Sequence, residues 1–198
     1  MFFLARILGS LYFINNISDA DLVKRCRRAL WGNTGLFLIF FLSFVIRTLL
    51  AEGYAVNPEN GEIFMEPYKY LTNFIEMPVV LVVFLIGVLA VLWGIIRTLW
   101  KPAFDKGIWF AGAGTVLTVL ALLLVAGYNN TAYYPSTADL QSSLTLANSC
   151  SSQFTLRVMA YVSILVPFVL AYIFYAWRSI DRKKIDAKEM QDEGGHAY

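Results

Sequence analysis

The sequence predicts an all-α membrane protein, in which four complete transmembrane helices form a bundle, a partial helix precedes them and the C-terminus is cytoplasmic. Three observations support this fold class. Of the 198 residues, 58% are hydrophobic and 15% are charged, whereas a soluble domain carries roughly 25% charged residues. Apolar runs of spanning length recur along the chain, and the segments between them alternate between rich and poor in basic residues. The net charge of +2 gives no indication of nucleic-acid binding.

The opening segment, residues 1–15, is apolar except for Arg6 and predicts a short helix. At 1.5 Å per residue, the stretch from Phe2 to Asn15 reaches about 21 Å, which is too short to cross the hydrocarbon core of a membrane. Two interpretations stay open: an interfacial or loosely packed helix, and the end of a transmembrane helix whose start is missing. In the second, Arg6 would pair with an acidic group or with a lipid phosphate.

Four later stretches reach the roughly 20 apolar residues that a transmembrane helix needs. The first reaches this length if Arg47 snorkels to the interface. Inside lipid, every backbone amide and carbonyl needs an internal partner, so these segments are helices. We expect a four-helix transmembrane bundle over residues 16–180 and a cytoplasmic tail over residues 181–198. The four predicted helices lie at about residues 31–51, 77–100, 107–128 and 158–180.

The orientation follows from the distribution of basic residues. Twelve of the sixteen fall within residues 16–30, within residues 97–106 or after Trp177, whereas the two intervening loops hold Lys69 and Arg157. Basic loops stay on the cytoplasmic side of the membrane, so these three segments are predicted to be cytoplasmic. The tryptophans agree, because amphipathic rings prefer the headgroup layer and four of the five lie at the basic ends of the predicted helices: Trp31, Trp100, Trp109 and Trp177.

Residues that hold a metal or a haem are scarce in this sequence. Its one histidine, His196, lies near the end of the tail. Haem iron takes an axial His, Met, Cys or Tyr, and no predicted helix contains a histidine. The sequence has no CxxC pair, no nucleotide-binding loop and no G-x-S-x-G element. We therefore predict no catalytic, cofactor-binding or metal-binding residue on this chain.

Glu76 is the first of three functional candidates, together with Arg6 and Pro167. Glu76 directly precedes Met77 and Pro78, where the second complete helix is expected to begin. An acidic residue in a first helical turn suits the helix dipole, and proline suits the start of a helix. The alternative is a role in proton or quinol chemistry at the mouth of the helix.

Pro167 and a stripe of small residues bear on helix packing. Pro167 lies in the middle of the last predicted helix, where it removes a backbone hydrogen bond and is expected to cause a kink. Such a break marks a substrate site in a carrier, but shapes only the packing of a static subunit. Gly107, Ala111 and Gly114 form a stripe that permits close approach of another helix.

Several stretches resemble subunit II of cytochrome bd quinol oxidase. The run SSLTLANSCSSQFTLRVM at residues 142–159 is similar to the segment before that family's last helix, and VPFVLAY at residues 166–172, followed by Trp177 and a basic tail, is similar to its ending. The resemblance covers essentially all of this chain, but only the C-terminal half of the family's nine-helix subunit. It extends to five further residues: Asn73, Phe74, Pro78, Tyr134 and Pro135.

The resemblance implies a non-haem subunit in a complex that transfers electrons from membrane quinol to dioxygen. In that family, haem b, haem d and the quinol site belong to subunit I, which would be the partner of this chain in the bacterial inner membrane. Subunit II is a scaffold, to which proton or oxygen conduction and a structural quinone are ascribed. The acidic residues linked to proton conduction lie in the half without a counterpart here. Met1 would then be an internal start or a truncation point.

Two other functions stay open on the residues alone. One is a small membrane carrier or channel, with Pro167 and Glu76 as gating elements. The other is a structural membrane fragment without an assembled partner. Co-purification with a haem-bearing subunit separates these possibilities from the oxidase interpretation.

Overall fold

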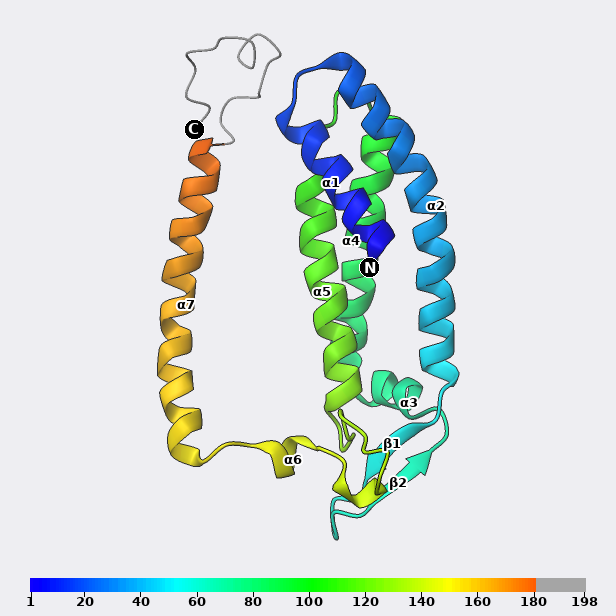
Figure 1. Cartoon of the computed structure of the whole chain (residues 1–198), viewed down its shortest axis with the longest axis vertical. Helices are drawn as coiled ribbons and strands as arrows, with labels where there is room; N and C mark the ends of the chain where they lie inside the picture. Colours follow the sequence, from blue (N-terminus) through cyan, green and yellow to red (C-terminus); the bar gives the residue numbers. More distant parts are fainter. Residues whose placement is uncertain (181–198) are drawn as a thin grey trace.

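The computed structural model describes residues 1–180, so the predicted tail lies outside the described residues. Within this part of the chain, four helices are long and apolar enough to cross a membrane. They are α2 (Ala20–Leu50), α4 (Pro78–Trp100), α5 (Gly107–Gly127) and α7 (Gln153–Ile180), and a short helix α1 (Phe2–Asn16) precedes them (Figure 1). The predicted fold class, four long helices and a partial N-terminal helix, is confirmed.

Helix α2 begins at Ala20, eleven residues before the predicted start. The carboxylate of Asp19 accepts a hydrogen bond from the amide of Leu22 at 2.7 Å and thereby caps the helix. A helix of 31 residues is about 46 Å long, which exceeds the hydrocarbon thickness. The basic segment that the sequence analysis treated as a loop is therefore a helical extension beyond the span.

Helix α1 packs one face against the other helices and is not loosely attached. It runs along α2 and also contacts α5 (Figure 1). The side chains of Ile7 and Leu11 are fully buried, in a cluster with Leu30, Ile95 and other apolar residues. Inside a membrane such contacts stabilise helix association through van der Waals packing. A loosely packed helix is therefore excluded, whereas an interfacial helix and the end of a transmembrane helix both remain predictions.

Helices α4 and α5 form the closest pair, and glycines set their separation. A Cβ atom added at Gly114 would lie 2.5 Å from the carbonyl oxygen of Gly87, and one at Gly94 would lie 2.7 Å from that of Gly107. No larger residue fits these positions unless the backbones move apart. The close helix approach expected from the small-residue stripe is thus observed, with α4 as the partner.

A small folded cap covers one end of the bundle, which we call the loop end. Strands β1 (Gly53–Val56) and β2 (Ile63–Glu66) pair antiparallel, and α3 (Lys69–Glu76) follows. The segment between α5 and α7 joins them, since Gln141 exchanges two hydrogen bonds with the backbone of Ile63. That segment contains the short helices η1 (Leu140–Ser142) and α6 (Leu146–Ser149). We call the opposite end, where α1 meets α2 and α4 meets α5, the basic end.

Helix α7 stands apart from the other helices instead of completing a four-helix bundle (Figure 1). Two aromatic contacts near the basic end connect it to them: the ring centroids of Tyr12 and Trp177 are 6.5 Å apart, and those of Trp109 and Phe174 are 6.3 Å apart. Nearly all side chains of α7 are exposed, and Phe168 is 70% exposed. The apolar surface of α7 is therefore left uncovered by the described chain.

Candidate functional site

The three residues singled out by the sequence do not come together. Arg6 lies on α1, Glu76 ends α3 at the loop end, and Pro167 lies within α7. The guanidinium of Arg6 is 5.6 Å from the ring centroid of Phe2, and it makes no ion pair with a carboxylate of residues 1–180. No shared site of these three residues exists in the described chain.

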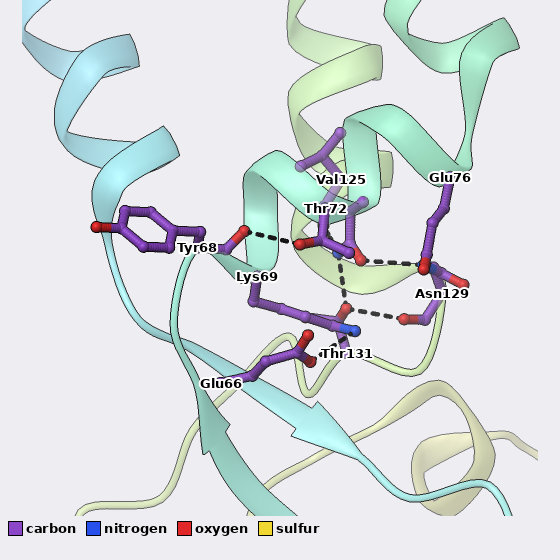
Figure 2. A network of polar contacts seen from close by, with 9 residues as sticks. Glu66, Tyr68, Lys69, Thr72, Glu76, Val125, Asn129 and Thr131 are labelled. Carbon is purple, nitrogen blue, oxygen red and sulfur yellow. Dashed lines mark hydrogen bonds and ion pairs between the residues drawn. The ribbon is translucent and has the colours of Figure 1, made fainter.

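Glu76 belongs to a set of hydrogen-bonded groups that we call the polar cluster, shown in Figure 2. Helix α4 begins at Pro78 with Met77 as its N-cap, so Glu76 lies outside the first turn of α4. The expected dipole-capping position is therefore not observed. Instead, the carboxylate of Glu76 accepts a hydrogen bond from the side-chain amide of Asn129. The cluster comprises Asn73, Glu76, Asn129, Thr131 and the carbonyl of Val125.

Asn73 is the centre of the polar cluster, and its side chain is fully buried. Its amide nitrogen donates to the carbonyl oxygen of Val125 at 2.9 Å and to the hydroxyl of Thr131 at 2.8 Å, while its oxygen accepts from Asn129 at 3.1 Å. The last four carbonyls of a helix lack partners within that helix. Asn73 of α3 therefore caps the C-terminus of α5, although the two residues that bond are 52 positions apart in the sequence.

The backbone after α5 explains how Asn129 reaches the cluster. Asn129 and Asn130 have φ angles of 57° and 51°, in the left-handed region that asparagine tolerates better than most residues. This turn directs the chain away from the axis of α5 and points the amide of Asn129 toward Asn73 and Glu76 (Figure 2).

An ion pair beside the cluster fastens α3 to the hairpin. The ammonium of Lys69 lies 3.2 Å from the carboxylate of Glu66, and the side chain of Lys69 is 8% exposed. Burial, together with the neighbouring Tyr54, raises the pKa of Tyr70 on the same helix. Throughout residues 1–180, each buried side-chain nitrogen and oxygen has a hydrogen-bond partner. The cluster thus holds structure together and presents no unpaired buried group for chemistry.

At the basic end, Arg27 forms a second polar anchor that was not predicted from the sequence. The guanidinium of Arg27 donates hydrogen bonds to the carbonyls of Thr98, Pro102 and Phe104, the last two at 2.8 and 3.5 Å. These carbonyls lie at the end of α4 and in the turn to α5, so Arg27 ties α2 to that turn. No feature of the sequence distinguishes Arg27 from the basic residues beside it.

Helix α7 continues through Pro167 without a compensating side chain nearby. The hydroxyl of Ser163 donates to the carbonyl of Met159 at 2.8 Å. The carbonyl that lacks its proline partner is that of Ser163 itself, so this hydroxyl does not satisfy it. Pro167 is exposed and lies on a helix that the rest of the described chain leaves uncovered.

Residues 1–180 offer few of the side chains that commonly hold a haem iron or a metal ion. This part of the chain contains no histidine, and no three His, Cys, Asp or Glu residues within it gather into a group that could hold a metal ion. Three methionines lie toward the loop end: Met65 in β2, Met77, which joins α3 to α4, and Met159, which lies near the start of α7 with a side chain that is 61% exposed.

Comparison with known proteins agrees with these features. The family model described as cytochrome bd terminal oxidase subunit II matches residues 1–180. The chain is 31% identical over 181 residues to the protein named cytochrome bd-I ubiquinol oxidase subunit 2 of Escherichia coli K12, and equally to its counterparts in strains O6:H1 and O157:H7. The alignment covers 89% of this chain and 46% of each relative, so the chain spans about half their length. The four apolar helices fit a multi-pass protein of the bacterial inner membrane. The chain belongs to the cytochrome bd terminal oxidase subunit II family.

Proposed function

We propose that this chain is a non-haem subunit of a bd-type quinol oxidase, which supports electron transfer from membrane quinol to dioxygen on a haem-bearing partner. The family match over residues 1–180 carries the proposal. The lack of histidine in residues 1–180 supports a non-haem role for this chain, because histidine is a common ligand of haem iron. Haem b and haem d would reside in subunit I, and a structural quinone remains part of the proposal.

The uncovered apolar surface of α7 supports a scaffolding role against that partner. Phe154, Phe168 and Tyr172 are each at least 70% exposed within the described chain. Contiguous apolar surface of this kind marks contact with lipid or with another protein. Because α7 contacts the remaining helices through aromatic pairs near its basic end, most of its length is free to pack against subunit I.

The same proposal includes the orientation of the chain in the membrane and the part of its relatives to which it corresponds. The basic end would face the cytoplasm, which supports a cytoplasmic C-terminus. The chain would correspond to the C-terminal half of its relatives, since it matches 46% of their length.

Co-expression with a haem-bearing subunit I tests the proposal. An affinity tag on this chain should retain subunit I from detergent extracts, and the eluate should consume dioxygen when quinol is added. A parallel expression that also supplies the N-terminal half of a relative's subunit II tests the extent, and it should increase the yield of the complex. If the chain elutes alone and moves a solute across liposome membranes, the carrier interpretation replaces this one.

A further inference from the structure

The basic segment of α2 divides into an inward and an outward side. Arg27 points inward to the turn between α4 and α5, where three carbonyls accept its hydrogen bonds. Lys24, Arg25 and Arg28 are exposed. None of these three forms an ion pair with a carboxylate of the described chain, although Asp21 lies one turn away. Three cations therefore project from one short helical stretch without a protein partner among residues 1–180.

The same outward side continues into the membrane-spanning part of α2. There it presents two glycines and then exposed apolar side chains. Positions spaced by three, four and seven residues share a helix face, and Arg25, Arg28, Gly32 and Gly35 are spaced in this way. A Cβ atom added at Gly32 or Gly35 would meet nothing within 4 Å, in contrast to the glycines between α4 and α5. Beside and below them lie three exposed apolar side chains: Trp31, Ile39 and Leu42.

This order of groups matches the order of groups along a phospholipid. Cations at the headgroup level attract anionic lipid, and arginine binds phosphate through paired N–H donors. An exposed indole prefers the layer directly beneath the headgroups. A helix surface without side chains at the next two positions leaves room for the first part of an acyl chain.

We propose that the outward face of α2 binds an anionic phospholipid. Lys24, Arg25 and Arg28 hold its phosphate, and its acyl chain lies over Gly32 and Gly35. The inference requires only that α2 spans the membrane, so it stands apart from the proposed oxidase function. It commits to lipid because the three cations complement a phosphate, whereas a partner helix would need carboxylates at that level.

Lipid binding to the purified full chain in detergent tests the proposal. The probes are dioleoylphosphatidylglycerol and, as the uncharged control, dioleoylphosphatidylcholine, with binding followed by native mass spectrometry and by the shift in Tm. The triple variant Lys24→Gln, Arg25→Gln, Arg28→Gln should bind the anionic lipid roughly a hundredfold more weakly, since each basic contact contributes a several-fold gain. The matched control Lys101→Gln, Lys106→Gln removes charge at the same end and should retain binding.

The possible outcomes separate the sources of the effect. Equal binding of the anionic lipid by the triple variant and the unmodified chain would overturn the proposal, as would equal stabilisation by the phosphatidylcholine. Inorganic phosphate that matched the effect of the lipid would also overturn it, because the acyl chain would then be irrelevant. A second variant, Gly32→Leu with Gly35→Leu, should weaken lipid binding. If it instead releases a co-purifying subunit while lipid binding persists, the face is a protein interface.

Discussion

Replacement of Asn73 by leucine tests whether the polar cluster stabilises the loop end. Leucine has a similar size but offers neither the two donors nor the acceptor of the asparagine amide. The carbonyl of Val125, in the last turn of α5, would lose the hydrogen bond that Asn73 provides at 2.9 Å. The hydroxyl of Thr131 would keep its bond to the carbonyl of Asn129, and Asn129 would keep its bond to Glu76.

The expected loss of stability follows from these partners. A buried carbonyl left unpaired costs about 1–3 kcal/mol, and each of the other lost hydrogen bonds contributes about 0.5–1.5 kcal/mol. Because the hydroxyl of Thr131 and the amide of Asn129 retain other partners, the loss of each of these two hydrogen bonds costs free energy at the lower end of that range. We expect Asn73→Leu to lower the free energy of unfolding by about 2–4 kcal/mol.

Equilibrium unfolding by sodium dodecyl sulfate in mixed micelles, followed by helical circular dichroism, measures this free energy. The matched control is Thr72→Val on the same helix, whose hydroxyl bonds only to the carbonyl of Tyr68 at 3.3 Å on an exposed turn. The control should change stability by less than about 0.5 kcal/mol. If both variants unfold like the unmodified chain, the cluster does not stabilise the loop end and the argument from burial fails.

Four further predictions follow from the helix contacts and from the titrating groups. Gly114→Ala should destabilise the chain by about 1–3 kcal/mol through overpacking, whereas Gly112→Ala on the same helix, with open space around it, should be neutral or stabilising in the same unfolding assay. Arg27→Gln removes charged hydrogen bonds and should cost about 1.5–3 kcal/mol, with faster proteolysis of the turn between α4 and α5; an unchanged cleavage rate would contradict the anchor. Glu76→Gln should leave assembly and quinol oxidation intact, because an amide oxygen still accepts from the neighbouring asparagine; a tenfold fall in quinol oxidation would assign Glu76 a chemical role instead. The pKa of Tyr70 is raised in the folded chain, so its contribution to stability is fully present below the ordinary tyrosine pKa of about 10 and is lost as the pH rises through the raised value; Tyr70→Phe should flatten that alkaline part of the stability profile.

The apolar runs were sufficient to predict the four long helices, because length and hydrophobicity alone decide which segments can span a membrane. Helix α2 shows the limit of that signal. Its first eleven residues are too polar to score as membrane-spanning, yet Asp19 caps them and they continue the helix. The hairpin and α3 were missed for a related reason: their strands have four residues each, and short elements give almost no periodic signal.

The polar anchors could not be predicted, because their partners are distant in the sequence. Asn73 bonds to groups 52 to 58 residues away, and Arg27 bonds to carbonyls 71 to 77 residues away. An asparagine or an arginine in a sequence does not indicate which distant group it will bond to. Glu76 was singled out for its position before Pro78, but its actual partner is Asn129, which is placed by two consecutive left-handed residues. The separation of α7 from the other helices could not be predicted either, because an apolar run of spanning length does not indicate which helix it packs against.

The proposed function assigns the redox chemistry to a partner of this chain. Reduced-minus-oxidised difference spectra, recorded per mole of this chain, test it most directly. The isolated chain should show no haem band, and the complex purified through its tag should show the bands of haems b and d. A haem spectrum that stays with the isolated chain after the partner has been removed would contradict the account.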